Sequence, residues 1–306
     1  MSHKPNTSKL ETTVVGSYPA DVSANKILNQ FYFSSSDSFH DAIKSAVDDE
    51  ERAGIDLISD GQVRGDIVSL VASRCHGITM NGRRPQIVSE IKRKGSIIAK
   101  DMAFVKSLAA KDVKIKGVVT GPYTLARNCE NKYYKNDEEA SWAFVDVLKE
   151  EFRKINGRVD MIQLDEPFLS VEYLPKAKDM IHELAKNLDV PLSLHVCGDV
   201  KNIFMDLLEY KVDIIDLEFV AYPKNIDLLK EYKFDKKLGF GCVSVEDRTI
   251  EPVGVIKERI KKALDALPAR QLIIDPDCGM RNLTREIAFA KLKNMVTARD
   301  EILQDN

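Results

Sequence analysis

The hydrophobic positions along the chain alternate between short apolar runs and longer segments with helical spacing. Each short run is rich in β-branched residues and ends in polar residues or glycine, and a helical pattern follows it. Several runs are apolar on both faces, which is typical of a parallel sheet buried under helices. The eight predicted strands are Thr12–Val15, Asp56–Ser59, Val113–Val119, Asp160–Leu164, Leu192–Val196, Asp213–Leu217, Leu238–Val243 and Leu272–Ile274.

Two of the intervening helices are clear from the spacing of their apolar residues. In Ser141–Ile155 and in Val253–Leu267 these residues recur every three or four positions, and Pro268 ends the second helix. Eight strands with helices between them predict an α/β fold, a (β/α)8 TIM barrel, with a doubly wound open sheet as the alternative. Residues 77–95 fit neither element, and we interpret Asn81–Arg84 as a hairpin or an excursion between the second and third units.

The composition indicates one folded domain with a large core. The 306 residues are 44% hydrophobic and 30% charged, and no apolar stretch approaches the roughly 18 residues of a membrane span. We assign the barrel to residues 11–306 and a polar N-terminal tail to residues 1–10. Five cysteines over this length suit a cytoplasmic protein with free thiols or a metal site. A net charge of −3 gives no reason to expect nucleic acid or a membrane surface as a partner.

Polar and reactive residues gather where the predicted strands end. In a (β/α)8 barrel these ends carry the active site, because the loops after all the strands open on the same face. An isolated acidic residue in such a loop is usually a helix cap or a solvated group, but seven of the eight strand ends share the pattern. The segments are Val15–Pro19, Ser59–Gln62, Thr120–Pro122, Asp165–Pro167, His195–Asp199, Asp216–Phe219 and Asp275–Gly279.

His195 and Cys197 form the sharpest pair of candidates. Two residues apart on one strand, they point to the same side with Cα atoms roughly 6–7 Å apart, so both can reach one zinc ion. Alone, such a pair is more often a small buried thiol beside a hydrogen-bonded histidine. Glu218 at the end of the next strand and Cys278 at the end of the last strand complete a tetrahedral set of zinc donors.

These donors favour sulfur chemistry over hydrolysis. Two thiolates and one carboxylate leave a divalent ion with a formal charge of −1, which makes it a poor generator of hydroxide. Such an ion suits a sulfur ligand, because it can hold as thiolate a thiol whose free pKa is about 8.5. The natural reaction of such a site is S-alkylation. We interpret Cys75, Cys129 and Cys242, which have no such partners, as ordinary buried thiols.

With these residues the chain resembles the catalytic C-terminal barrel of cobalamin-independent methionine synthase, in the short, archaeal-type form without the N-terminal folate-binding half. The resemblance extends from Val15 to the final helix. The matching motifs are Val-Gly-Ser-Tyr-Pro (15–19), Ser-Asp-Gly-Gln-Val-Arg-Gly-Asp (59–66), Thr-Gly-Pro-Tyr-Thr (120–124), Gln-Leu-Asp-Glu-Pro (163–167), His-Val-Cys (195–197), Glu218 and Asp-Pro-Asp-Cys-Gly (275–279).

The resemblance implies a zinc-dependent methyltransferase that makes methionine from homocysteine. The zinc ligands that it implies are His195, Cys197, Glu218 and Cys278. It also implies that Val15, Gly16 and Ser17 contact the amino acid portion of homocysteine. Asp165 then binds the ammonium group, and a buried carboxylate does need a cation to offset its desolvation. Backbone N–H groups near Gly16 and Ser17 suit the carboxylate of the substrate.

Three positions depart from the family pattern. Where the family has a second ammonium-binding Glu, this chain has Gln62, with Asp60 close by. Glu246 stands near the position of the family's proton-donating His, and we note it as a candidate catalytic residue. Asn128 replaces a Trp that stacks on folate in the family, and we expect Trp142, the one Trp of the chain, to pack in the core.

The departures bear on the methyl donor. A folate N5 amine must be protonated to leave, whereas a methyl–cobalt bond is already activated. The missing His therefore favours a methylated corrinoid, methylcobalamin or a corrinoid protein, as donor. The alternatives are the same reaction from a methyl-folate and a corrinoid:thiol methyltransferase of the coenzyme M type. A zinc- or thiol-binding barrel without turnover is a more distant alternative.

Overall fold

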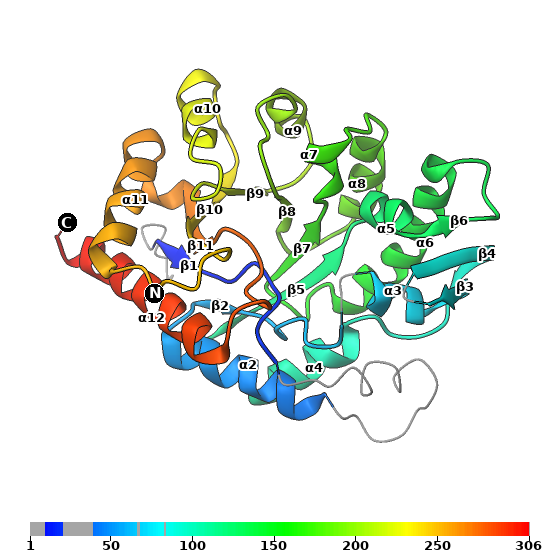
Figure 1. Ribbon diagram of the computed structural model, residues 1–306, viewed down its shortest axis with the longest axis horizontal. Coiled ribbons are helices and arrows are strands. Elements are labelled where there is room, and N and C mark those ends of the chain that lie inside the picture. Colours follow the sequence, from blue (N-terminus) through cyan, green and yellow to red (C-terminus); the bar gives the residue numbers. More distant parts are fainter. Residues whose placement is uncertain (1–9, 21–38, 66–67, 83, 306) are drawn as a thin grey trace, which may run out of the picture.

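A computed structural model describes residues 10–20, 39–65, 68–82 and 84–305. Its centre is an eight-stranded parallel sheet in the order β1-β11-β10-β9-β8-β7-β5-β2, with helices packed around it (Figure 1). The barrel strands are β1 (Glu11–Thr12), β2 (Leu57–Ile58), β5 (Lys114–Thr120), β7 (Met161–Asp165), β8 (Leu192–Val196), β9 (Ile214–Glu218), β10 (Lys237–Val243) and β11 (Leu272–Pro276). Each lies within or overlaps one of the eight predicted strands, so the TIM-barrel prediction is confirmed.

The first and second strands close the sheet into a barrel. Thr13 forms a parallel bridge with Leu57, and its hydroxyl donates to the Leu57 carbonyl at 2.8 Å. On the other side, the Thr13 N–H donates to the carbonyl of Ile274 at 2.8 Å. Thr12 adds a bond from its N–H to Asp56 Oδ2 at 2.9 Å. These short contacts leave β1 and β2 only two residues long each, which is shorter than the sequence predicts.

Helices of varied length surround the barrel. Asn136 caps α6 by accepting from the N–H of Glu139 at 2.9 Å, and Pro252 and Pro268 flank α11. Both helices therefore lie where the apolar spacing predicts them, although α6 begins four residues earlier. The helices are α2 (His40–Ala53), α3 (Ser69–Ser73), α4 (Ala99–Leu108), α5 (Pro122–Asn128), α6 (Asp137–Ile155), α7 (Phe168–Val171), α8 (Ala177–Ala185), α9 (Phe204–Leu208), α10 (Asn225–Glu231), α11 (Val253–Ala266) and α12 (Arg285–Asp305).

The excursion between the second and third units is a hairpin, as predicted, extended to a small second sheet. In Figure 1 it lies at the margin of the molecule, beside α3 and β6. Glu151 of α6 anchors its return: Oε1 accepts from the N–H groups of Ile98 at 2.8 Å and Ala99 at 2.7 Å, and Oε2 pairs with Arg93 at 2.6 Å. The strands are β3 (Cys75–Asn81), β4 (Arg84–Arg93) and β6 (Glu130–Asn131).

The interior of the barrel changes from apolar to polar along the strand direction. Near the start of the strands, Leu57, Met161, Ile214 and Ile273 form a small apolar cluster. Two residues further on, the same faces of three strands carry Gln163, Asp216 and Asp275, all buried. The polar face of the barrel therefore begins inside it and continues to the carboxyl ends of the strands.

Two boundary features complete the fold. Leu10, placed by the sequence at the end of the polar tail, is fully buried, and its carbonyl accepts from Arg299 at 2.8 Å. The rest of that segment lies outside the described residues. Among the residues that the structure describes, no helix combines the length and apolar character needed to span a bilayer.

Glu50 of α2 should make the stability of the fold depend on pH. It is fully buried, its Oε2 accepts from the N–H of Ser59 at 2.7 Å, and burial raises its pKa to about 8, above an ordinary value of 4.5. Because the folded-state pKa is the higher one, this carboxyl stabilises the fold fully below about pH 4.5. That contribution is lost as the pH rises through 8.

We therefore expect Glu50→Gln, which keeps an acceptor for Ser59, to flatten the loss of melting temperature between pH 6 and pH 9. Glu258→Gln, on an exposed residue of α11, is the matched control and should follow the wild-type protein. Thermal unfolding followed by circular dichroism checks this. Equal slopes for wild-type protein and Glu50→Gln would exclude Glu50 as a source of the pH dependence.

Candidate metal and substrate site

The loops at the carboxyl ends of the strands are tied to one another. The N–H of Tyr18 donates to the carbonyl of Gly61 at 2.8 Å, and the N–H of Met280 donates to the carbonyl of Ser17 at 2.6 Å. These bonds join the loop after β1 to the loops after β2 and β11. The predicted strand-end residues therefore lie on one shared rim.

Three of the four predicted metal ligands meet at this rim. His195 lies in β8, one residue before its end, Cys197 follows β8, and Cys278 follows β11. Cys197 Sγ lies 3.1 Å from His195 Nε2 and 3.6 Å from Cys278 Sγ. The possible ligand atoms of these three residues all lie within 4.8 Å of one another, which makes the cluster a candidate metal site.

Asp216 on β9 orients the histidine of this cluster. Its Oδ1 lies 3.1 Å from His195 Nδ1, and both side chains are buried. This contact leaves Nε2 directed at the sulfur atoms, as in the carboxylate–histidine–metal arrangement of many metalloproteins. The sequence places Asp216 at a strand end but gives it no role. Its position two residues before Glu218 was the available signal, because it puts both on the same face of β9.

The charges within the cluster stabilise an anionic sulfur. The hydrogen bond from Cys197 and the neighbouring His195 lower the pKa of Cys278 to about 4, against the opposing effect of burial. Burial alone would lower the pKa of His195, but Cys197 and Asp216 hold it above its ordinary value. The protons shared among His195, Cys197 and Cys278 thus occupy the positions that a bound cation would take.

The donor set fits a tetrahedral zinc ion. Donors that bind one such ion at about 2.0–2.3 Å lie roughly 3.4–3.8 Å from each other. The observed separations of 3.1 Å and 3.6 Å are close to that range, so the side chains need to open only slightly. One nitrogen and two thiolate donors are also the soft ligands that zinc favours.

Glu218, the fourth predicted ligand, is close but is not part of the cluster found among the described residues. Its Oε2 accepts from the N–H of Gly198 at 2.8 Å. Burial and the charge of Cys278 raise the pKa of Glu218 to about 7, against the opposing effect of the bond from Gly198. Glu218 therefore adjoins the cluster through a backbone contact, and its role as a ligand stays a prediction.

The residues predicted to bind the amino acid portion of the substrate are adjacent to each other. Asp165 ends β7, and its Oδ2 lies 3.4 Å from Gln62 Nε2. A Cβ on Gly16 would stand 2.7 Å from Gln62 Oε1, so a larger residue there would displace the Gln62 side chain. Burial raises the pKa of Asp165 to about 6, while His195 and a bond from Gln163 oppose this shift. A cationic group beside Asp165 would relieve this desolvation.

The remaining predicted substrate residues frame this pair. Val15 is buried, and its carbonyl accepts from Gln163 Nε2 at 2.7 Å. Ser17 packs so closely on the last loop that a Cβ on Gly279 would stand 2.0 Å from its Oγ. Asp60 turns its Oδ1 to the N–H of Gln62 at 3.0 Å. Asp60 therefore stabilises the loop that carries Gln62 through this hydrogen bond.

Glu246 and Trp142 both lie at the surface of the barrel. Glu246 is exposed in the loop after β10, and its catalytic role stays a prediction. Trp142 on α6 is 36% exposed, so the expectation that it packs in the core is wrong. It lies on a polar face of a helix whose opposite face is buried. The three remaining thiols, Cys75, Cys129 and Cys242, are buried as predicted.

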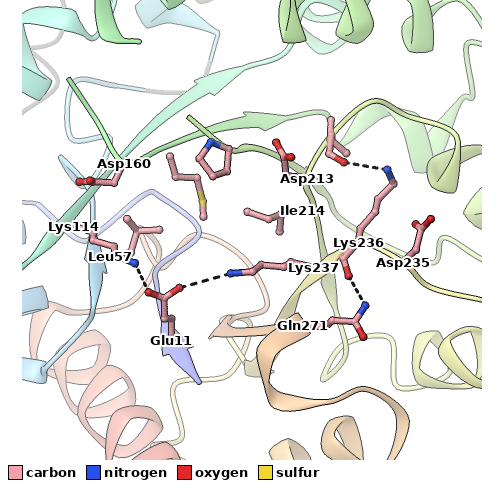
Figure 2. Close-up of a pocket in the computed structure, with 13 residues that line it drawn as sticks. Glu11, Leu57, Lys114, Asp160, Asp213, Ile214, Asp235, Lys236, Lys237 and Gln271 are labelled. Atoms are coloured by element: carbon pink, nitrogen blue, oxygen red, sulfur yellow. Dashed lines mark hydrogen bonds and ion pairs between the residues drawn. The ribbon is translucent and has the colours of Figure 1, made fainter. Parts of the chain in front are cut away.

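A cavity of about 590 Å³ lies at the other end of the barrel, where the strands begin (Figure 2). Several of its charged groups already have partners within the protein. Glu11 forms ion pairs with Lys114 and, at 4.0 Å, with Lys237. Lys236 donates to the carbonyl of Val212 at 3.0 Å. Neither cysteine nor histidine lines this cavity, so the candidate chemistry belongs to the opposite rim.

Comparisons with known proteins identify the family. Residues 10–301 match the family model described as cobalamin-independent synthase, catalytic domain. The chain is 40% identical over 303 residues to a methionine synthase of Methanothermobacter thermautotrophicus, covering 94% of this chain and 98% of that protein. It is 37% identical over 306 residues to a methionine synthase of Methanocaldococcus jannaschii, with coverage of 94% and 97%.

Solved structures share the fold. A B12-independent methionine synthase from a Shewanella species, in complex with selenomethionine, superposes with a TM-score of 0.86 at 22% identity, covering 97% of this chain and 99% of that chain. A methyltransferase from Methanosarcina mazei gives a TM-score of 0.69 at 17% identity, with coverage of 96% and 94%. The cobalamin-independent description of the family favours the methyl-folate alternative over the corrinoid donor. The chain is a methyltransferase and belongs to the cobalamin-independent methionine synthase family.

Proposed function

We propose that this protein transfers a methyl group to the sulfur of homocysteine and so forms methionine. The observation that carries the proposal is the position of two groups on one rim: the His195, Cys197 and Cys278 cluster, and the Asp165 carboxylate beside Gln62. The first suits a thiol through a soft cation, and the second suits an ammonium group. Homocysteine carries both groups on one short chain.

One set of residues would bind the metal ion and another set the amino acid portion of the substrate. His195, Cys197 and Cys278, with Glu218 as the proposed fourth ligand, would hold zinc. Zinc bound there supplies the positive charge that keeps a thiol sulfur deprotonated near neutral pH. Asp165 binds the ammonium group, and Gly16 and Ser17 present backbone N–H groups to the carboxylate. The substrate is thereby held at both ends, with its sulfur toward the rim centre.

The transfer itself needs a nucleophilic sulfur and a donor that releases its methyl group. A lone pair of the sulfur forms the new S–CH₃ bond, and the electron pair of the broken methyl bond stays with the carrier. Holding both partners in line supplies much of the rate enhancement, because a reaction between two molecules becomes effectively intramolecular.

The two candidate donors make different demands on the protein. The family description favours a methyl-folate, whose nitrogen must gain a proton as it leaves. The stretch Gly239–Glu246 offers no histidine for that step, and Glu246 is exposed. This observation keeps the methylated corrinoid as a second candidate donor, because a corrinoid can release its methyl group without being protonated.

A donor assay tests the proposed function. The zinc-loaded protein is incubated with homocysteine and either methyl-folate polyglutamate or methylcobalamin, and methionine is measured. We expect methionine from at least one donor, and the faster donor identifies the class. Turnover with the folate alone would refute the corrinoid. No methionine from either donor would refute the proposed function.

Asp165→Asn tests the ammonium-binding role. The neutral amide keeps the shape of Asp165 but removes the charge, so we expect the KM for homocysteine to rise about tenfold or more, with bound zinc unchanged. Steady-state kinetics and metal analysis measure the two quantities. An unchanged KM would show that the ammonium group binds elsewhere.

Cys278→Ser tests the metal site. A serine hydroxyl is a poor zinc ligand, so this variant should lose most of its zinc and all methyl transfer while the barrel stays folded. Cys129→Ala, at a buried thiol outside the cluster, is the matched control and should keep its zinc. Elemental analysis and circular dichroism provide the readouts. Full zinc content and activity in Cys278→Ser would remove this residue from the site.

A further inference from the structure

Two buried residues beneath the rim connect the proposed subsites for the ammonium group and the carboxylate. Gln163 lies on β7, two residues before Asp165 and on the same face of the strand. Its Nε2 donates to Asp165 Oδ1 at 2.8 Å and to the Val15 carbonyl at 2.7 Å. One amide thus uses both of its N–H bonds to hold the carboxylate and the end of the first strand at a fixed spacing.

Lys116 of β5 completes the connection. Its Nζ donates to Gln163 Oε1 at 2.6 Å and to the carbonyl of Val14. Both Lys116 and Gln163 are fully buried. The lysine fixes which way the amide of Gln163 is turned, because an ammonium group can only donate, so the amide oxygen must face it. The amide N–H groups must then face Asp165 and Val15.

We propose that Gln163 and Lys116 are positioning residues that set the selectivity of the enzyme for thiols carrying an α-amino group. This inference rests on the proposed function and adds residues that touch no substrate. Gln163 binds Oδ1 of Asp165, and so the other oxygen, Oδ2, faces Gln62 and the rim. The carboxylate therefore presents one defined oxygen to an incoming ammonium group.

The charges around Asp165 support the inference. Burial raises its pKa, whereas His195, the bond from Gln163 and the charge of Lys116 lower it and so favour the carboxylate form. Burial likewise lowers the pKa of Lys116, and the nearby Asp216, Asp275 and Asp165 oppose that shift. The pair thus offsets part of the cost of holding an anion in the barrel before any substrate arrives.

Gln163→Glu is the sharpest test. The glutamate keeps the size of the side chain and an acceptor for Lys116, but it loses both N–H groups and sets a second carboxyl against Asp165. The KM for homocysteine should rise about tenfold or more, with kcat within about threefold of wild type. The inhibition constant of 4-sulfanylbutanoate, which is homocysteine without its amino group, should rise far less than the KM, because this analogue has no group for Asp165 to bind and senses only the lost bond to Val15. Zinc content should stay the same.

Gln271→Glu is the matched control. Gln271 also donates to two carbonyls, those of Phe234 at 3.3 Å and Lys236 at 3.1 Å, but at the opposite end of the barrel. Gln271→Glu should leave both the KM for homocysteine and the inhibition constant of 4-sulfanylbutanoate unchanged. Gln163→Asn, which keeps the amide but withdraws it from Asp165, replaces Gln163→Glu if the latter does not fold, and should shift the KM in the same direction.

The possible outcomes separate this inference from the proposed function. If wild-type protein makes methionine but the Gln163 variants keep their KM for homocysteine, the positioning role is wrong. If the variants weaken homocysteine and the amine-free analogue equally, Gln163 supports the barrel in general, and the selectivity role is again wrong. If wild-type protein makes no methionine from either donor, the proposed function itself fails, and this inference fails with it.

Discussion

Closure of the sheet is the constraint on which the site depends. Thr13 holds the first strand to Leu57 on one side and to Ile274 on the other, through contacts only a few residues long. This closure brings the loop that carries Gly16 and Ser17 between Gln62 of the second unit and Cys278 of the last. In an open sheet of the same strand order, Gln62 after β2 would lie at the opposite edge from Gly16 and Ser17 after β1, and no single substrate could contact all of them.

The barrel interior beneath the rim carries more charge than an ordinary core. Lys116, Gln163, Asp216 and Asp275 are all buried, and burial shifts the pKa of Asp275 well above its ordinary value. Buried polar and charged groups cost stability unless they have partners. Their presence therefore indicates that they position the residues of the rim and do not only stabilise the fold. Asp216 orients His195, and Gln163 orients Asp165. The metal side and the amino acid side of the rim are therefore supported from the same layer.

The barrel and the central cluster could be predicted from the sequence because they depend on local periodicity. Residues two apart on a strand share a face, which is enough to pair His195 with Cys197, and the order of strands brings Cys278 to the same rim. The place of Glu218 could not be predicted, because a carboxylate can turn either to a metal or to a backbone N–H, and here it contacts Gly198. The exposure of Trp142 could not be predicted for a similar reason: helical spacing identifies the faces of α6, but tertiary packing decides how far each one is covered. Lys116 and Gln163 lie in otherwise apolar strands, and a polar residue that faces into a barrel is a sequence signal for a buried supporting role.

The tight contacts of the rim also limit how this sequence can diverge. A methyl group on Gly16 would stand 2.7 Å from Gln62 Oε1, and one on Gly279 would stand 2.0 Å from Ser17 Oγ. Each of these glycines adjoins a side chain from a different βα unit, so a larger residue at either position requires a smaller or rearranged residue at its partner. Substitutions at the rim should therefore accumulate in pairs, and the spacing of these loops should change more slowly than the rest of the barrel.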